Sequence, residues 1–256
     1  MTRIWSEKGH EITVLAGMVH YTDSEKRPEY KHKRFVHKQH GRVSVWRCHV
    51  SESYNVNFAG RMWAYFSFVF SSIRAGLFRV KGKYDLIVVT SPPLFVGITA
   101  YILSRFWGIP FVFEVRDLWP ESAIDTGVVT NRLIIKFAYR FEAFMYKKAK
   151  LVNVLTPAFR NILLERKKVP AEKVIMIPNA ADFSLSDEIL ESFDPVQFRK
   201  DNGLDDFFVI TYVGAHGVAN HLVQLLDAAG LLTDTNVLFQ LIGSGMQKEM
   251  LIRETE

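Results

Sequence analysis

The chain has little cysteine: Cys48 is the one thiol among its 256 residues. A single cysteine excludes an intramolecular disulfide framework and any metal site built from several thiolates, and it favours a reducing compartment. Neither a G-x-G-x-x-G fingerprint nor a Walker pattern occurs, which argues against a dinucleotide-dependent dehydrogenase and against an NTPase. The first ten residues lack the apolar core of a signal peptide, because Glu7, Lys8 and His10 interrupt them.

Two further absences concern metals and membranes. The eight histidines follow no compact ligand spacing, so no metal site is predicted. One apolar run, Leu94–Phe113, has about the length of a membrane span. Arg105 lies inside it, and Gly108-Ile109-Pro110 divides it into a helix-sized and a strand-sized piece. We therefore predict a buried helix followed by a buried parallel strand, with a transmembrane helix as the alternative.

Positive charge is concentrated at the start of the chain. Residues 1–83 contain 15 Lys and Arg against 6 Asp and Glu, whereas the remainder contains 17 against 21. Such a segment indicates either a solvated face or an anionic partner, such as a membrane surface or a phosphate-bearing lipid. No nucleic-acid-binding motif accompanies the charge, so nucleic acid is not predicted as a partner.

One segment of this basic region is rich in aromatic residues. Phe58–Val80 is apolar over much of its length and is flanked by Arg and Lys. This composition predicts a helix with one core face and an end that touches a membrane. Core packing is the alternative explanation for most of its aromatic side chains.

From residue 86 onward, strand-like and helix-like segments alternate. Such alternation predicts an α/β protein with doubly wound parallel sheets and helices on both faces. Before it, two short strands are separated by a polar, charged loop over Val19–His40. The predicted elements are strands at Glu11–Ala16, Val43–Arg47, Leu86–Thr90, Phe111–Val115, Leu151–Leu155, Lys173–Ile177, Phe208–Val213 and Val237–Ile242, and helices at Phe58–Val80, Leu94–Trp107, Asn131–Lys150, Pro157–Lys168 and His221–Leu232.

The character of the sequence changes between Pro178 and Asp206. A turn signal, Asn179-Ala180-Ala181-Asp182, is followed by an acidic, weakly apolar stretch. We therefore predict a first domain over 1–182, an interdomain linker over 183–206 and a second α/β domain over 207–256. One β-α-β unit cannot cover both faces of its own sheet, so the second domain is predicted to be incomplete.

Three predicted strands run directly into polar or glycine-containing turns. The first leads to Ser91-Pro92-Pro93, the second to Arg116-Asp117, and the third to Gly214-Ala215-His216-Gly217. In open α/β sheets, ligands bind beyond the carboxyl ends of the strands. The sequence therefore predicts a binding site at these turns.

Four segments, TSPPLFVG, FEVRDLWPES, VIMIPNAAD and YVGAHG, resemble a bacterial glycosyltransferase of family 4. The likeness spans Gly9 to Lys248 and is to the branch that builds O-antigen, capsule and exopolysaccharide. It implies a GT-B-like fold of two Rossmann-like domains, a nucleotide-diphosphate sugar as donor substrate, no cofactor and retention of anomeric configuration. It also implies a lipid-linked saccharide as acceptor and a peripheral place at the anionic inner face of the cytoplasmic membrane.

The second domain would supply the donor contacts. Glycines after a buried strand let the backbone approach a phosphate where a helix begins. The turn after Val237–Ile242 resembles the family's second glycine turn, and Lys248 is the predicted diphosphate contact. A tight turn without a ligand remains the alternative. The predicted donor-binding residues are Gly214, His216, Gly217, Gly243, Gly245 and Lys248.

The first domain would supply the catalytic and acceptor residues. Many family members have a His-Asp pair where this chain has Arg116 and Asp117, the predicted catalytic residues. Arginine cannot act as a general base at neutral pH, so Arg116 is predicted to contact phosphate or to pair with Asp117 or Glu121. The predicted acceptor-cleft residues are Ser91, Glu114 and Glu121, with a rigid turn or structural ion pairing as the alternative.

The chain departs from the family pattern at both ends. Only eight residues precede Gly9-His10, where the family has a first strand and a glycine loop, and the Glu-x7-Glu motif of the donor domain is missing. These departures predict a truncated transferase that is inactive as it stands. The alternatives are a non-catalytic acceptor-binding or membrane-docking subunit that needs a separate donor-binding partner, and a degenerate gene product.

Overall fold

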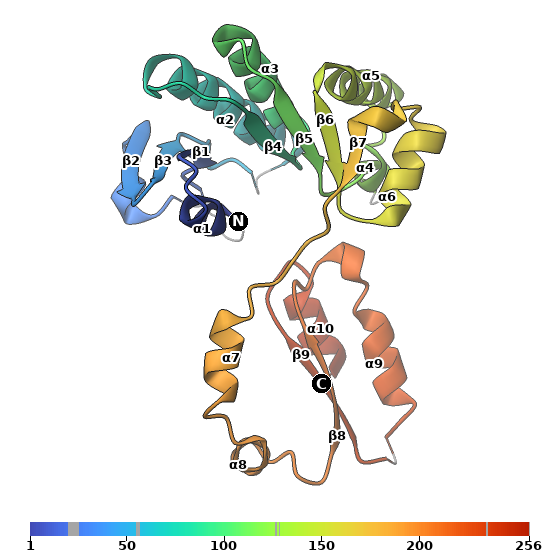
Figure 1. Cartoon of the computed structure of the whole chain (residues 1–256). Helices are drawn as coiled ribbons and strands as arrows, with labels where there is room; N and C mark the ends of the chain where they lie inside the picture. Colours follow the sequence, from blue (N-terminus) through green and yellow to red (C-terminus); the bar gives the residue numbers. More distant parts are fainter. Residues whose placement is uncertain (20–25, 55–56, 126, 128, 234, 256) are drawn as a thin grey trace. The chain divides into compact units, whose positions relative to one another are not determined.

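The computed structural model describes residues 1–19, 26–54, 57–125, 127, 129–233 and 235–255. The chain forms two compact units, unit 1 (Met1–Asn179) and unit 2 (Ala180–Glu256) (Figure 1). The domain boundary proposed from the sequence, residue 182, lies close to this division.

Unit 1 contains two β-sheets of different character. Its strands are β1 (Ile12–Gly17), β2 (Phe35–His40), β3 (Val43–Cys48), β4 (Ile87–Ser91), β5 (Phe111–Val115), β6 (Leu151–Val154) and β7 (Val174–Met176). In the three-stranded sheet, β3 lies between β1, which is parallel to it, and β2, which is antiparallel. In the four-stranded sheet the order is β4-β5-β6-β7, and all neighbours are parallel. Helical segments connect the strands of this second sheet, as the alternation of segments predicts.

Several helices of unit 1 begin or end at residues that cap them. They are α1 (Thr2–Glu7), α2 (Phe58–Phe78), α3 (Val96–Trp107), α4 (Glu121–Asp125), α5 (Arg132–Lys148) and α6 (Pro157–Asn161). The side chains of Asn131 and Thr156 accept backbone N–H bonds at the starts of α5 and α6. Gly108 ends α3 in the left-handed conformation, with φ +69°. α6 continues directly into a π-helix, η2 (Ile162–Arg166), so the single α-helix predicted over 157–168 is wrong in its second half.

The core of unit 1 lies between the four-stranded sheet and its helices. Phe111, Phe113 and Val115 of β5 are buried together with Val152 and Val154 of β6. These strands lie inside the sheet, and their apolar side chains pack against α3, α5 and η2 (Figure 1). The run 94–113 is therefore a helix and a buried strand, as predicted. Among the helices that the structure describes, none combines the length and hydropathy needed to cross a lipid bilayer.

Two predictions about the first third of the chain are wrong in part. The loop predicted over Val19–His40 contains strand β2, whose last four residues are exposed. A polar strand at the edge of a sheet lacks the apolar residues by which strands are predicted, so this strand could not be predicted from the sequence. Residues 20–25 of the predicted loop lie outside the described residues. The strands described in unit 1 also form two separate sheets rather than one, with β1 and β4 each at an edge.

The aromatic residues of α2 are divided between its buried side and its exposed side. Its buried residues are mostly small: Ala64, Ser67, Val69, Ser72, Ala75 and Gly76. Trp63, Phe70 and Phe78 are instead exposed. Tyr65, Phe66 and Phe68 are half-buried, and the first two pack on buried Phe95, so the expectation of core packing holds for these three and fails for Trp63 and Phe70. Small residues let α2 approach α3 closely: a Cβ on Gly76 would meet Leu103.

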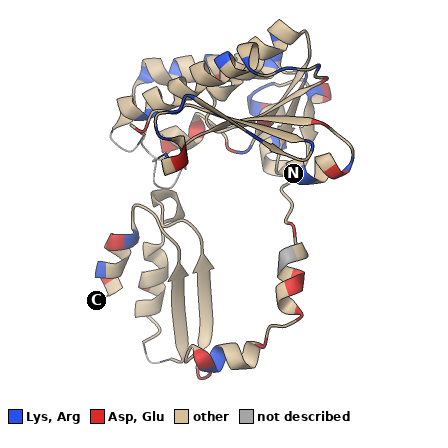
Figure 2. Cartoon of the chain, turned by 90° about the vertical axis from the view of Figure 1, so that its left-hand side faces the viewer, with Lys and Arg blue, Asp and Glu red and all other residues tan. Residues whose placement is uncertain are grey.

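Unit 2 is built around two parallel strands, β8 (Phe208–Val213) and β9 (Val237–Ile242), both at their predicted bounds. Its helices are α7 (Ser184–Leu190), α8 (Pro195–Asp201), α9 (Val223–Gly230) and α10 (Lys248–Thr255). The predicted linker 183–206 thus contains two helices. Lys and Arg recur along the helices of unit 1, whereas α7 carries Asp and Glu (Figure 2). Arg199 of α8 donates hydrogen bonds to the carbonyl oxygens of Leu204 and Phe207, which ties this helix to the start of β8.

Candidate functional site

The two glycine turns of unit 2, residues 214–217 and 243–247, lie against each other beyond the carboxyl ends of β8 and β9. We call this contact the turn crossing. Gly214 and His216 each donate a backbone N–H to a carbonyl oxygen of the other segment, over 3.0 and 2.8 Å. His216 in turn accepts the N–H of Gln247 over 3.0 Å. Parallel strands end at the same edge of a sheet, so both turns lie where ligands of α/β proteins bind.

Glycine is required at two positions of the turn crossing. A Cβ on Gly243 would overlap the carbonyl oxygen of Gly214. Gly245 has φ +155°, and a Cβ there would overlap the backbone of His216. Gly217 differs, because no described atom lies within 4 Å of the position of its Cβ. The first two glycines are therefore explained by close backbone approach.

His216 is the most unusual side chain of the turn crossing. It is only 3% exposed, yet neither Nδ1 nor Nε2 has a hydrogen-bond partner among the described residues. The Oε1 atom of Gln247 is buried and equally without a partner there. A buried polar atom without a partner costs about 1–3 kcal/mol. The turn crossing therefore contains two side chains with buried polar atoms that have no described partner.

Lys248 places a positive charge beside the turn crossing. It is the first residue of α10, and its exposed side chain donates a hydrogen bond from Nζ to the carbonyl oxygen of Gly243 over 3.0 Å. The structure thus brings five of the six predicted donor residues into one cluster: Gly214, His216, Gly243, Gly245 and Lys248. Gly217 follows His216 at the start of the short 3-10 helix η4 (Val218–Asn220).

In unit 1, the predicted catalytic residues follow the carboxyl end of β5. Ser91 is buried at the end of β4, and its carbonyl oxygen accepts the N–H of Arg116 over 3.0 Å. The Arg116 side chain is half exposed, and its Nε lies 4.0 Å from Oε1 of Glu114. In the described part of the chain, its ion-pair partner is Glu114, and not Asp117 or Glu121 as the sequence suggested. Asp117 is partly buried in the loop that follows.

Glu114 is held from the neighbouring strand as well. It lies opposite Asn153 in the β5–β6 register, and both side chains are buried. Nδ2 of Asn153 donates to Glu114 Oε2 over 3.2 Å, while its Oδ1 accepts the N–H of Ile177 over 2.9 Å. Asn153 therefore links Glu114 to Ile177, the first residue after β7. Sequence reasoning missed Asn153, although a polar residue inside an apolar strand was a usable signal.

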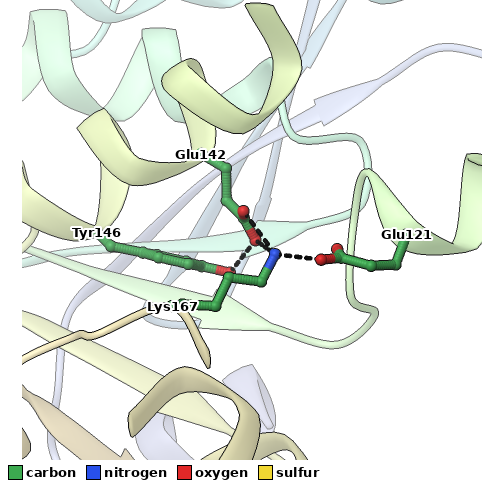
Figure 3. A network of polar contacts seen from close by, with 4 residues as sticks. All are labelled: Glu121, Glu142, Tyr146 and Lys167. Atoms are coloured by element: carbon green, nitrogen blue, oxygen red, sulfur yellow. Dashed lines mark hydrogen bonds and ion pairs between the residues drawn. The ribbon is translucent and has the colours of Figure 1, made fainter. Parts of the chain in front are cut away.

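Glu121 belongs to a buried network that the sequence did not predict (Figure 3). Nζ of Lys167 donates to Oε1 of Glu121 over 2.6 Å and to both carboxylate oxygens of Glu142 over 2.8 and 2.7 Å. The hydroxyl of Tyr146 donates to Oε1 of Glu142 over 2.8 Å. The ammonium also lies 5.0 Å from the ring centroid of Tyr139. The Lys167 ammonium thus pairs with two carboxylates, and it links Glu121 at the start of α4 to Glu142 of α5.

Burial dominates the acid–base behaviour of this network. Glu142 is almost completely buried, and desolvation raises its pKa although the Lys167 ammonium and the Tyr146 hydroxyl act in the opposite direction. Desolvation also raises the pKa of Tyr146 well above its usual value, with the Glu142 charge as the next cause. Both groups therefore resist ionisation more than their exposed counterparts do.

The structure describes no group of three or more His, Cys, Asp or Glu side chains that could hold a metal ion. The two candidate clusters are instead a glycine-lined turn crossing in unit 2 and a set of charged side chains at the strand ends of unit 1. Each suits recognition by hydrogen bonds and by positive charge, as an anionic ligand without a metal would require.

The family comparison covers the whole of unit 1. Residues 1–180 match the family described as the glycosyl transferase 4-like domain. The chain is 24% identical over 248 residues to WcaI of Escherichia coli (strain K12), which is named for colanic acid biosynthesis; the match covers 95% of this chain and 60% of WcaI. It is 27% identical over 133 residues to the alpha-D-kanosaminyltransferase of Streptomyces kanamyceticus, covering 52% of this chain and 34% of that protein. The chain therefore spans less than two thirds of the length of these relatives.

Solved structures show the same fold. Sucrose-phosphate synthase of Thermosynechococcus elongatus superposes with a TM-score of 0.57 at 14% identity, over 94% of this chain and 62% of that chain. HepE of Anabaena, solved in complex with UDP, superposes with a TM-score of 0.55 at 17% identity, over 83% and 51%. Both are GT-B glycosyltransferases, so the predicted GT-B-like α/β fold is confirmed.

Proposed function

The chain belongs to the glycosyl transferase 4-like family, and on that premise we propose that it acts in transfer of a sugar from a nucleotide diphosphate. The donor is a nucleotide-activated hexose or N-acetylhexosamine, and the acceptor is a lipid-linked saccharide of a cell-surface polysaccharide. The name of WcaI supports the polysaccharide assignment. The proposed place of work is the inner face of the cytoplasmic membrane, where a lipid-linked acceptor is found.

The turn crossing carries this proposal. Its buried His216 and Gln247 offer polar atoms without partners, and exposed Lys248 offers a permanent positive charge nearby. A nucleotide diphosphate provides the matching groups, because its phosphate oxygens accept hydrogen bonds and carry negative charge. Backbone approach at Gly243 and Gly245 leaves no side chain between the turns and such a ligand. We take UDP as the probe, since HepE was solved with it.

We place the acceptor side at the strand ends of unit 1. The Nε atom of Arg116 lies beside the buried Glu114, and the side chain of Arg116 is half exposed to solvent. Ser91 and Asp117 flank it at the same edge of the sheet. Arginine stays protonated at neutral pH, which suits it to stabilise negative charge on a leaving phosphate and not to accept a proton.

The proposed reaction retains the configuration of the sugar. The bond between the anomeric carbon and the donor phosphate oxygen breaks, and the acceptor hydroxyl oxygen forms the new bond from the same face. The acceptor proton passes to an oxygen of the departing diphosphate, so no side chain has to serve as a base. Positioning of donor and acceptor then supplies most of the acceleration, together with stabilisation of charge on the leaving group.

Replacing His216 with phenylalanine tests the donor site. Phenylalanine has a similar shape and no unpaired polar atoms, so the melting temperature of unit 2 should stay the same or rise. If the ring nitrogens of His216 bind phosphate, the Kd for UDP should rise by about 10- to 100-fold, the worth of one hydrogen bond to a charged group. Isothermal titration calorimetry on the full chain measures the affinity directly.

A second histidine provides the comparison. His221 is exposed and has φ +45°, a conformation that asparagine tolerates, so His221→Asn should leave the turn crossing intact. A loss of UDP affinity in this variant alone would assign the phosphate contact to His221. If His216→Phe binds UDP as tightly as the wild type, the assignment of the donor site to His216 is wrong. If the wild-type protein binds neither UDP nor another nucleotide diphosphate, the proposed function is wrong.

A further inference from the structure

Helix α5 carries a second line of apolar residues, which is exposed at Leu133 and Phe137 and packs at Phe144 against Tyr101 of α3. Leu133, Phe137 and Phe144 are 79%, 60% and 37% exposed. With Arg140 they follow the spacing i, i+4, i+7, i+11, which puts them in line along one side of a helix. An apolar line of this kind on the solvent side of a core helix indicates contact with another apolar phase.

The core side of α5 is formed by a different line of residues. Ala138, Glu142 and Met145 are buried, and Ala149 continues the same spacing just past the helix end. At 100° per residue, this buried line lies on roughly the opposite side of the helix from Leu133 and Phe137. Leu133 and Phe137 therefore lie away from the buried line, although the ring of Phe137 stacks on Phe141 at the edge of the core.

A shallow surface depression, mostly apolar, runs beside the exposed stripe. It is lined by Arg132, Ile135, Lys136, Tyr139, Arg140 and Ala143, all from α5. Arg132, Lys136 and Arg140 are one turn apart, so their charges form a ladder along the helix. On the other flank, Nζ of Lys148 lies 5.8 Å from the ring centroid of Phe144. The apolar stripe is thus bordered by positive charge on both sides.

The exposed charges of α5 all have the same sign. Its cations are Arg132, Lys136, Arg140, Lys147 and Lys148. Its single acid, Glu142, is buried and paired with Lys167, so it neutralises none of them. Within the described part of the chain, none of the five cations forms an ion pair. A second copy of this helix would bring like charges together, which disfavours self-association through the stripe.

We propose that α5 lies on an anionic lipid bilayer, with Leu133 and Phe137 in the interface and with lipid phosphates beside the side chains of Arg132, Lys136 and Arg140. A helix with exposed aromatic and aliphatic residues flanked by Lys and Arg binds membranes in this way, through apolar area and attraction to acidic headgroups. This assignment gives the proposed membrane location a defined surface. It differs from the expectation that Phe58–Val80 makes the contact.

Vesicle sedimentation tests the proposal. The full chain is mixed with vesicles of phosphatidylcholine containing about one third phosphatidylglycerol, and with vesicles of pure phosphatidylcholine. We expect binding to the acidic vesicles and much weaker binding to the neutral ones. Leu133→Gln with Phe137→Gln should reduce the partition coefficient by at least tenfold. Lys136→Gln with Arg140→Gln should reduce it roughly 25-fold, about fivefold for each charge near the surface, and high salt should mimic this loss.

The matched control lies on α2. Phe70→Gln with Phe78→Gln removes two side chains that are 62% and 74% exposed in the segment named by the sequence, and it should leave vesicle binding unchanged. Loss of binding in this control, with none in the α5 variants, would move the contact to α2 and overturn the assignment. Equal binding to neutral vesicles, or no binding at all, would also overturn it. So would oligomers of the wild-type chain that dissociate in the Leu133 and Phe137 variant, because the stripe would then be a protein interface.

The experiments can contradict the membrane-binding proposal and the sugar-transfer proposal independently. Sedimentation requires no donor and no turnover, so a chain that binds no UDP can still bind vesicles through α5. Conversely, the α5 variants leave the turn crossing unchanged and should keep the wild-type affinity for UDP in calorimetry. An α5 variant that lost both properties would point to misfolding, which tryptophan fluorescence detects because all five tryptophans lie in unit 1.

Discussion

Lys167→Met should lower the free energy of unfolding of unit 1 by about 3–5 kcal/mol, the usual cost of removing one partner from a buried ion pair. The Lys167 side chain is 10% exposed and that of Glu142 is 2% exposed, so little water can replace the lost ammonium. Methionine fills much of the volume, and the loss will therefore come from two unpaired carboxylates. Denaturant unfolding followed by tryptophan fluorescence reports on unit 1 alone, since unit 2 contains no tryptophan.

The loss should depend on pH in a defined direction. Burial raises the pKa of Glu142 in the folded chain, and removal of the lysine raises it further. The folded state then binds a proton that the unfolded state has released, so stability falls as pH rises from the ordinary carboxyl pKa through the raised one. The destabilisation should consequently be larger at pH 7.5 than at pH 5.5, where Glu142 of the variant is more easily protonated.

Two companion variants isolate the network. Glu142→Gln in the Lys167→Met background removes the buried charge, and it should recover a large part of the lost stability and most of the pH dependence. Arg166→Met changes an exposed cation next to Lys167 and should alter stability by less than about 0.5 kcal/mol. A loss of equal size at both pH values, without recovery in the double variant, would show that lost packing and not lost charge destabilises the protein.

Three strands of this protein can be predicted from the sequence because they are almost entirely apolar. β5, β8 and β9 were predicted at their observed bounds, since each is a short apolar run ended by a turn signal. β2 was missed because His37, Lys38 and His40 lie at an exposed edge, where no apolar side chain is required. The π-helical turn of η2 has no signal at all, because i+5 hydrogen bonding leaves the composition of a helix unchanged.

The location of the candidate site was predictable, but its partners were not. Strand ends meet at one edge of a parallel sheet, so Arg116, Ser91 and the glycine turns could be placed from the strands alone. The pairing of Glu114 with Asn153 depends on the β5–β6 register, which no local pattern determines. Lys167 joins Glu121 and Glu142 across 46 and 25 residues, and such long-range ion pairs appear only once the helices are packed.

Gly243→Ala should abolish measurable UDP binding while leaving unit 1 folded. The new Cβ would overlap the carbonyl oxygen of Gly214, so one turn must move away from the other. Three backbone hydrogen bonds now hold them together, from Gly214 to Ile242, from His216 to Ser244 and from Gln247 to His216. Displacement of a ligand site by about 1 Å can cost roughly 100-fold, which is the rise in the Kd for UDP that we expect as a minimum.

The control for this substitution is another glycine of unit 2. Gly230 ends α9, and no described atom lies within 4 Å of the position of its Cβ. Gly230→Ala should therefore keep the wild-type affinity for UDP, with a slightly higher melting temperature because alanine favours helix. Amide spectra of both variants show whether β8 and β9 stay paired. Tight UDP binding by Gly243→Ala, with those strands still paired, would mean that the close approach of the two turns has no part in holding a donor, and that the glycines serve only to let the backbone turn.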